Sequence, residues 1–532
     1  MKKAVSFILA AIMLIMLPAG AFADSARCSC DTPPVVMVNG FGTELYHDNG
    51  DGTQSAVFPM GAVEIVSAIP SLAGAFAALA AGEHELFRTL LSKALFRLMG
   101  NMMCNPDGTA KISARSYQTP TDTDIHKKDT HGQYQGENDG GRYIFGYDWR
   151  LDPVESAREL EKYIEQVKKI TRHDKVVLCA HSEGTCVAAS YISLYGSKNI
   201  EKVVFLSGAF QGITLVGNLF TKNLDVKGKA DAFELFIETF LGGDTTGDFV
   251  SSLFSVLKDA FIVDMLLCLV NNILEEDLDA LYDECLTEII TTMPGVWSFV
   301  PDDYYEDAKK ALYSDTGSKY SALTKLTDGY HYGVQVGLSD RLKAEQKNGL
   351  AVCVSMGYAI APIPVYDNCV DQTDMLIDTK FGSLGATCAP IGETLKADST
   401  NKYLSSDLLV DASTCAFPDS TWFVRYQDHN DFCDAYNDFV YYLLTFDGQP
   451  TVTSNAAFPQ FMACDGHKVL VPAGALPEAD TRPSIIRLGE NTYKLIKELI
   501  ESNKKKKKKP PVPKLLPRDG FVMSFNMPRI LR

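Results

Sequence analysis

The strongest constraint on the fold is a strand–helix–strand pattern between Lys175 and Gly208. Two apolar runs, KVVLCA (Lys175–Ala180) and KVVFLSG (Lys202–Gly208), have the continuous hydrophobicity of strands that are buried on both faces. The residues between them that follow Ser182 are compatible with a helix. Strands joined at this spacing pair in parallel through a right-handed crossover. The pattern therefore predicts an α/β fold with a mostly parallel central sheet.

Further strand and helix signals extend this alternation along the chain. Helices are expected over 57–100, 153–172 and 434–446, and Pro153 is placed to open the second of them. Residues 105–141 are rich in turn-forming types and are expected to form a long surface loop. Four more strands are expected: PPVVMVNG (Pro33–Gly40), RYIFGYDWR (Arg142–Arg150), LAVCVSMGY (Leu350–Tyr358) and, as the last good strand, TWFVRY (Thr421–Tyr426).

These signals predict a core that is interrupted by one large insertion. No strand alternation appears from about Gly208 to Asp340, and this strongly apolar segment is expected to be a helical insertion. The expected parts are a signal peptide (1–23), a first core part (24–207), the insertion (208–340), a second core part (341–450), a C-terminal extension (451–503) and a lysine- and proline-rich tail (504–532).

The N-terminal residues have the pattern of a secretion signal. Lys2 and Lys3 precede an apolar run, and Ala21-Phe22-Ala23 fits a cleavage site for small residues. The alternative is a membrane anchor, but the run is short for a bilayer span, which takes ~20 residues. We therefore expect a secreted, extracellular protein.

Composition excludes some functions and leaves others open. The formal net charge of −17 disfavours nucleic acid as a partner, because nucleic-acid affinity comes from lysine and arginine. Thirteen cysteines allow disulfides in a secreted chain, but the odd number leaves at least one thiol unpaired, and Cys28 and Cys30 are too close to pair with each other. No zinc-like spacing is present, so we expect no zinc site. The run Lys504–Lys509 is expected to be a solvated tail, with contact to an anionic cell surface as the alternative.

Ser182 is the best candidate for a nucleophile. It lies in Ala180-His181-Ser182-Glu183-Gly184, directly after a buried strand and before a helix, as a nucleophile elbow requires. Ala180 replaces the usual first glycine by the next smallest residue. The alternative is an ordinary serine at a helix N-cap.

The base and the acid should follow Ser182 in the order acid, then histidine. His429 directly follows the last expected strand and precedes a helix, which is where a loop can bring an imidazole over the nucleophile. Two acids compete: Asp407 in SSDLLVDAS and Asp374 in VDQTDMLID. We favour Asp407, because only one strand then separates the acid from the base. The oxyanion should be held by the backbone N–H groups of Phe41 and Glu183, with Gly40 and Gly42 allowing the chain to turn.

These segments together resemble the α/β-hydrolase lipases, and most closely the lecithin:cholesterol acyltransferase and lysosomal phospholipase family. The resemblance covers about 35–445 in scattered blocks, which are PPVVMVNGFGTELY, YDWRLDP (Tyr147–Pro153), AHSEGT and MPGVWSFVPDDYY (Met293–Tyr305). Secreted bacterial triacylglycerol lipases are also similar, and their acid turn resembles SDLLV at Ser406–Val410.

The resemblance implies an α/β-hydrolase fold with a helical cap or lid. It also implies ester chemistry on lipids, at a membrane or micelle interface. It assigns Ser182, Asp407 and His429 as the triad, and Phe41 and Glu183 as oxyanion donors. No organic cofactor is needed for this chemistry, and the acyl-enzyme would be released by water or by an alcohol. The competing hypothesis is a non-catalytic surface-binding protein that kept the hydrolase fold.

Overall fold

The structure is a computed structural model in which a mixed sheet of eight strands forms the centre of the molecule. It describes residues 33–119, 143–241, 245–398, 400–430, 434–464, 470–472, 491–495 and 497. All neighbouring strands are parallel except the pair of β11 and β12. In spatial order the strands are β12 (Leu470–Pro472), β11 (Phe461–Cys464), β10 (Thr421–Arg425), β7 (Ala351–Tyr358), β6 (Ile200–Leu206), β5 (Val176–His181), β1 (Val35–Val38) and β4 (Tyr143–Phe145).

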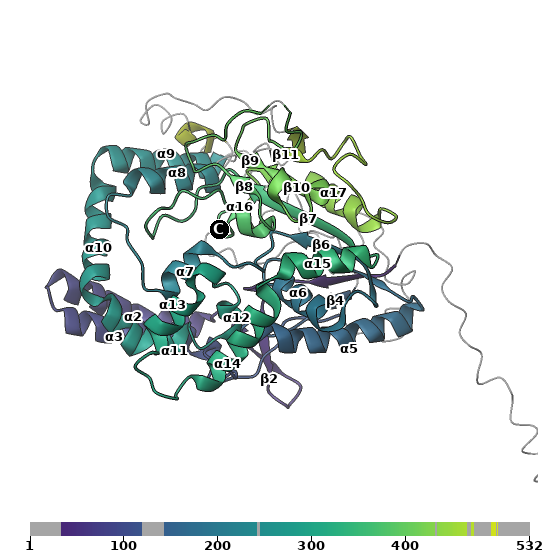
Figure 1. Ribbon diagram of the computed structural model, residues 1–532. Coiled ribbons are helices and arrows are strands. Elements are labelled where there is room, and N and C mark those ends of the chain that lie inside the picture. Colours follow the sequence, from purple (N-terminus) through teal and green to yellow (C-terminus); the bar gives the residue numbers. More distant parts are fainter. Residues whose placement is uncertain are drawn as a thin grey trace, which may run out of the picture.

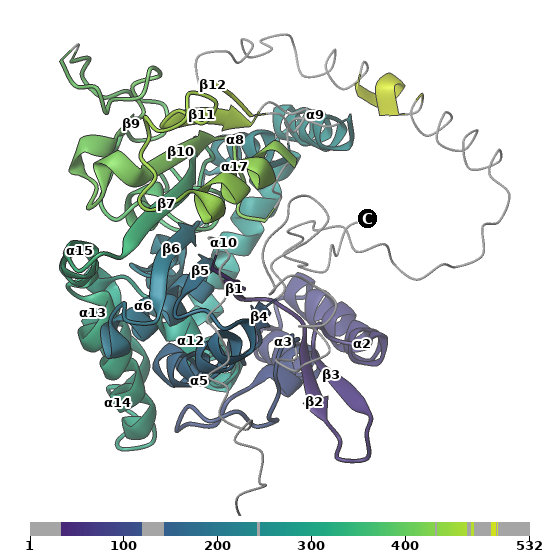
Figure 2. The ribbon, with the colours of Figure 1, turned by 90° about the vertical axis from the view of Figure 1, so that its right-hand side faces the viewer.

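The strands are apolar at consecutive positions because helices cover both faces of the sheet. Val36 and Val38 of β1 belong to the core that also contains α5 (Pro153–Thr171) and α6 (Gly184–Tyr195). Val35 and Met37 alternate with them and pack in a second core with α17 (Asp434–Thr445). Figures 1 and 2 show α17 separated from α5 and α6 by the sheet. The predicted α/β fold with a mostly parallel sheet flanked by helices is confirmed.

Helix α5 shows why the predicted helix boundaries near 153–172 are correct. The Asp152 carboxylate accepts a hydrogen bond from the Val154 N–H at 3.0 Å, and Pro153 occupies the first turn, where no N–H donor is needed. The helix ends at Arg172, which adopts the left-handed conformation with φ of 60°. The helix α17 also begins at the predicted residue.

Between the neighbouring strands β6 and β7, the described residues form helices joined by turns and loops, without a strand. Figure 1 shows α8 to α10 lying away from the sheet, with α2 (Ala62–Ala80) and α3 (His84–Met99) beneath α10. The helices of this segment are α7 (Thr214–Phe220), α8 (Ala230–Leu241), α9 (Thr245–Asp259), α10 (Ile262–Leu281), α11 (Thr287–Ile289), α12 (Pro294–Trp297), α13 (Asp302–Tyr313), α14 (Ser321–Tyr330) and α15 (Leu338–Lys347).

Several short elements differ from the sequence prediction. A hairpin of β2 (Leu45–Asp48) and β3 (Gln54–Phe58) occupies the start of the region that we expected to be helical from residue 57. The strand β10 is not the last one, because β11 and β12 extend the sheet beyond it. These strands have three to five residues, which is too short for a clear periodic signal. The remaining elements are a short helix α16 (Thr379–Gly382) and the strand pair β8 (Thr387–Cys388) and β9 (Val410–Asp411). Five short 3₁₀ or π-helical turns are also present in the described chain, at η1 (Gly100–Met102), η2 (Tyr282–Leu286), η3 (His331–Gln335), η4 (Ala412–Thr414) and η5 (Pro418–Ser420).

Some predictions fall wholly or partly outside the described residues. These are the signal peptide at 1–23, the pair Cys28 and Cys30, most of the loop at 105–141, most of the extension at 451–503 and the tail at 504–532. Within the described part of the chain, ten cysteines have free thiols.

A buried ion pair holds the segment YDWRLDP in place after β4. Arg150 is fully buried, and its Nε and Nη2 donate to the two carboxylate oxygens of Asp148 at 2.8 and 2.6 Å. Its remaining donors reach the carbonyls of Asn101 and Ile112 at 3.2 and 2.7 Å. The guanidinium therefore joins this segment to the chain that follows α3. Its planar shape allows it to donate two parallel hydrogen bonds to the Asp148 carboxylate.

The helix α12 packs directly on the same segment. The Gly295 N–H donates to the Arg150 carbonyl at 3.0 Å, and the Ile213 N–H donates to the Phe299 carbonyl at 2.8 Å. The Trp297 side chain is buried, and its indole N–H donates to the Thr291 carbonyl. We call residues 293–300 the tryptophan block. The block is therefore hydrogen-bonded to the loops that follow β4 and β6.

Arg150→Met is expected to destabilise the protein by about 3–5 kcal/mol, because it leaves the Asp148 carboxylate buried without its partner. The matched control is Arg115→Met, which removes an ion pair between half-exposed Arg115 and Glu159 and should cost at most ~1 kcal/mol. Urea unfolding of both variants measures the difference. Equal losses for the two variants would contradict the role given to Arg150.

Candidate functional site

Ser182 lies at the carboxyl end of β5, in the turn that leads into α6. Its φ of 54° places a non-glycine residue in the left-handed region, which is uncommon and strained. Hydrogen bonds hold the backbone in this conformation. The Ser182 N–H donates to the Leu206 carbonyl at 3.1 Å, and the Ser182 carbonyl accepts from the Thr185 hydroxyl at 2.6 Å. This geometry is that of a nucleophile elbow.

The sequence around Ser182 explains how the elbow fits into the sheet. Ala180 is fully buried and pairs with Val38 of β1 and with Phe205 of β6, so alanine is accommodated at the place of the usual glycine. A Cβ atom on Gly40 would lie 2.5 Å from the Cβ of Ser182 and 3.0 Å from its Oγ. Gly40 is therefore needed because the loop after β1 passes directly beside the hydroxyl of Ser182.

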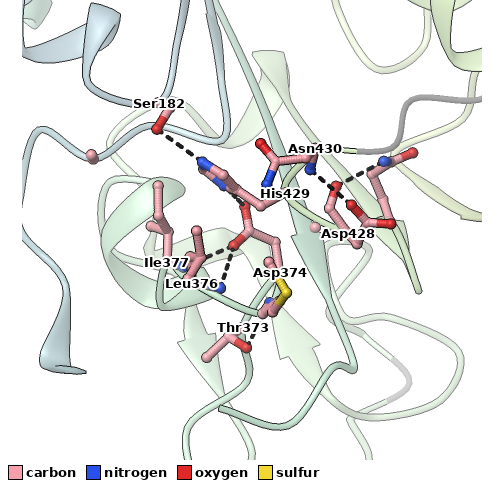
Figure 3. A network of polar contacts seen from close by, with 12 residues as sticks. Ser182, Thr373, Asp374, Leu376, Ile377, Asp428, His429 and Asn430 are labelled. Carbon is pink, nitrogen blue, oxygen red and sulfur yellow. Dashed lines mark hydrogen bonds and ion pairs between the residues drawn. The ribbon is translucent and has the colours of Figure 1, made fainter. Parts of the chain in front are cut away.

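His429 contacts the hydroxyl group of Ser182. Figure 3 shows the imidazole between Ser182 and Asp374, with one ring nitrogen directed at each. The distance from Ser182 Oγ to His429 Nε2 is 2.8 Å, and the distance from His429 Nδ1 to Asp374 Oδ2 is 2.9 Å. Since a carboxylate only accepts, Nδ1 carries the proton, and Nε2 is free to accept from the hydroxyl. All three side chains are buried.

The acid beside the histidine is Asp374, which corrects our preference for Asp407. Asp407 contacts neither Ser182 nor His429 among the hydrogen bonds of the described residues. Its carboxylate instead accepts from the hydroxyls of Ser405 and Tyr358, at 2.6 and 3.1 Å, and lies 3.5 Å from Arg425 Nε. Asp407 therefore supports the turn and the end of β10 rather than the histidine.

Asp374 reaches the histidine because its loop folds back over the end of β7. Ile360 and Thr373 exchange backbone hydrogen bonds at 3.0 and 3.3 Å, so the chain returns to β7 before Asp374. A Cβ atom on Gly357 would lie 2.8 Å from the Cβ of Asp374 and 2.3 Å from the carbonyl of Gln427. Only glycine allows the acid loop and the histidine loop to approach each other at this point of β7.

The second oxygen of Asp374 is also satisfied. Its Oδ1 accepts from the N–H groups of Ile377 and Leu376, at 2.8 and 3.2 Å (Figure 3). These bonds leave Oδ2 to the histidine and fix the plane of the carboxylate. The orientation of the imidazole is consequently set by a rigid partner.

The two predicted oxyanion residues lie on either side of Ser182. Glu183 follows it at the start of α6, and Phe41 follows Gly40 in the loop that passes the hydroxyl. The Phe41 ring packs on Trp149 and Phe299, with centroids 4.2 and 5.8 Å apart, and it is about one third exposed. Both residues are therefore next to Ser182, where the sequence analysis expected the two backbone donors.

The side chain of Glu183 has an environment that sequence reasoning did not anticipate. It is fully buried, and neither carboxyl oxygen has a hydrogen-bond partner in the described structure. Burial, and secondarily the nearby Asp148 carboxylate, raise the pKa of the Glu183 carboxyl well above its usual value. Burial therefore favours the neutral form of this side chain, which adds no negative charge beside Ser182.

Thr185 is a further site residue that the sequence reading missed. Its hydroxyl donates to the Ser182 carbonyl and accepts from the Ala209 N–H at 3.0 Å. It thereby connects the elbow to the chain after β6. The available signal was the threonine in the first turn of the helix, where hydroxyl residues commonly bond to the backbone. No group of three potential metal-ligating side chains occurs among the residues that the structure covers.

Comparison with known proteins gives little independent information. No family model and no curated protein sequence match this chain. A search of solved structures finds the crystal structure of the Tle4–Tli4 complex, with 14% sequence identity over 62% of this chain and 75% of the other. The TM-score is 0.23, which supports no conclusion about fold or function.

Asp374→Asn is expected to slow the reaction of Ser182 with a fluorophosphonate by about a thousandfold or more, because the histidine loses its correct tautomer and orientation. Asp407→Asn is the matched control. It should keep most of the labelling rate, since Asp407 contacts neither reacting residue. The measurement is the second-order rate constant of labelling. A larger loss in Asp407→Asn would reinstate Asp407 as the acid.

Proposed function

We propose that this protein is a serine hydrolase or acyltransferase that acts on lipid esters, with an α/β-hydrolase fold. The observation that carries the proposal is the chain of two hydrogen bonds from Ser182 through His429 to Asp374, which starts at a serine with positive φ. A serine, a base and an orienting acid in this arrangement form the nucleophilic triad of acyl transfer. The N-terminal secretion pattern leads us to place the activity outside the cell.

Each residue then has a defined step in the reaction. Ser182 Oγ attacks the ester carbonyl while His429 Nε2 takes the hydroxyl proton, and Asp374 stabilises the imidazolium that forms. The N–H groups of Phe41 and Glu183 hold the oxyanion. His429 then gives its proton to the departing alcohol, and an acyl-Ser182 ester remains. Water or a second alcohol repeats these steps in reverse order and releases the acyl group.

A lipid substrate is supported by an exposed apolar surface on α2. The large apolar side chains that are exposed on this helix are Val63, Ile65, Val66, Ile69 and Phe76, which we call the α2 apolar face. In the described part of the chain α2 is also the one helix that is long and apolar enough to cross a membrane, and only 22% of it is buried. Exposed apolar surfaces of this kind mark sites of contact with membranes or partners. We therefore propose that the α2 apolar face lies against a lipid surface.

The helical segment between β6 and β7 is proposed to be the cap of the hydrolase. Exposed apolar side chains also occur at the start of α10, at Phe261, Met265 and Leu266. The segment follows β6, whose end lies beside Ser182. A cap placed there can contact both the acyl chain and the surrounding lipid.

Labelling with a serine-reactive fluorophosphonate tests the proposed function. The wild type should be labelled, and Ser182→Ala should not be, because the variant lacks the nucleophile while its backbone is unchanged. A folded wild type that takes no label would overturn the proposal and favour the non-catalytic surface-binding alternative. Product analysis with p-nitrophenyl esters, triglyceride and phosphatidylcholine, with and without an alcohol acceptor, separates hydrolase from transferase.

The double substitution Val66→Ser with Phe76→Ser is expected to weaken binding to phosphatidylcholine vesicles, since it removes two exposed apolar side chains from α2. Hydrolysis of a soluble p-nitrophenyl ester should be unaffected, because neither residue contacts the triad. Leu194→Ser on α6 is the control for the loss of an exposed apolar side chain elsewhere. Vesicle sedimentation measures binding. Equal binding by all three proteins would refute the role of the α2 apolar face.

A further inference from the structure

We propose that His181, the residue before the nucleophile, is a positioning residue that fixes the backbone of His429. This inference rests on the proposed function, because it concerns the base of that reaction. His181 is the last residue of β5 and is 2% exposed. Its Nε2 lies 3.0 Å from the carbonyl oxygen of His429, which is 248 residues away in the sequence.

The chemistry of this contact defines the state of His181. A carbonyl oxygen only accepts hydrogen bonds, so His181 Nε2 must carry a proton and donate it. Burial, and secondarily the neighbouring His429, lower the pKa of the His181 imidazole well below its usual value. The ring is therefore neutral, with the proton on Nε2. A neutral ring also avoids repulsion when His429 becomes an imidazolium.

The contact ties the base and the nucleophile to one rigid strand. Ser182 follows His181 directly, so the strand that places the hydroxyl also holds the loop of His429. The two imidazole rings lie against each other, with centroids 4.9 Å apart and an angle of 35° between their planes. The side-chain contacts of His429 to Ser182 and Asp374 fix its ring atoms, and the bond from His181 fixes its main chain. The side-chain contacts and the main-chain contact together define the position of His429 Nε2.

The loop of His429 needs such a support because it follows β10 as irregular chain. Its local hydrogen bonds involve the flanking residues, with the Asn430 N–H donating to the Asp428 carboxylate at 2.7 Å and the Gln427 amide donating to the Asp428 carbonyl at 2.9 Å. These bonds are local to the turn. The bond from His181 ties the main chain of His429 to the strand that carries Ser182, and a base displaced by 1 Å can lose about 100-fold in rate.

Three substitutions separate positioning from simple packing. The amide nitrogen of His181→Gln can reach the place of the imidazole Nε2 and donate to the same carbonyl. His181→Asn carries the same amide on a side chain that is one methylene shorter, so it cannot reach. His181→Leu fills the buried space without a donor. Steady-state kinetics on a soluble p-nitrophenyl ester, with thermal unfolding of each variant, provide the comparison, and Ser182→Ala gives the background rate.

If His181 positions His429, the Gln variant should keep a kcat closest to that of the wild type. The Asn and Leu variants should lose about 10- to 100-fold in kcat with little change in KM, because the displaced base affects chemistry more than binding. If His181 only fills the core, Leu should be the best-tolerated variant and activity should follow thermal stability, which would overturn the inference. An inactive, unlabelled wild type would instead overturn the proposed function, and this role with it.

Discussion

The position of β5 between β1 and β6 is the constraint on which the site depends. Parallel pairing on both sides, with Ala180 opposite Val38 and Phe205, fixes the register of the end of β5. The turn at Ser182 is therefore held in a left-handed conformation by its neighbours rather than by its own preference. The same register brings Gly40 from the end of β1 against the hydroxyl. The hydrophobic packing of the sheet thus determines the geometry of a polar site.

The parts of the structure that could be predicted are those with strong local signals. Strands with long apolar runs, such as β5, β6 and β7, are long enough to be recognised, and α5 carries its own start signal in Asp152 and Pro153. Ser182 and His429 could be chosen because each follows a clear strand. The short strands β2, β3, β11 and β12 were missed, since they are stabilised by pairing with neighbours that the sequence does not reveal.

The acid that contacts His429 could not be chosen correctly from the sequence, because both candidates have the same local chemistry. In each case one carboxylate oxygen accepts from backbone N–H groups two or three residues further along, which are those of Leu376 and Ile377 for Asp374 and that of Leu409 for Asp407. Such turns look alike in sequence. What distinguishes them is the pairing of Thr373 with Ile360 and the close approach at Gly357, which are both tertiary features. The glycine in the strand LAVCVSMGY was the one visible sign, because a glycine inside a strand often marks a close backbone approach.

The tryptophan block also anchors one part of the helical segment beside the site. Its bonds to the carbonyl of Arg150 and to the N–H of Ile213 attach residues 293–300 to the loops that follow β4 and β6, and Phe299 packs against the ring of Phe41. Displacing the block would break these bonds and expose the buried Trp297. The position of the Phe41 ring beside Ser182 is therefore set in part by a segment far along the chain from it, which is itself held by the loops after β4 and β6.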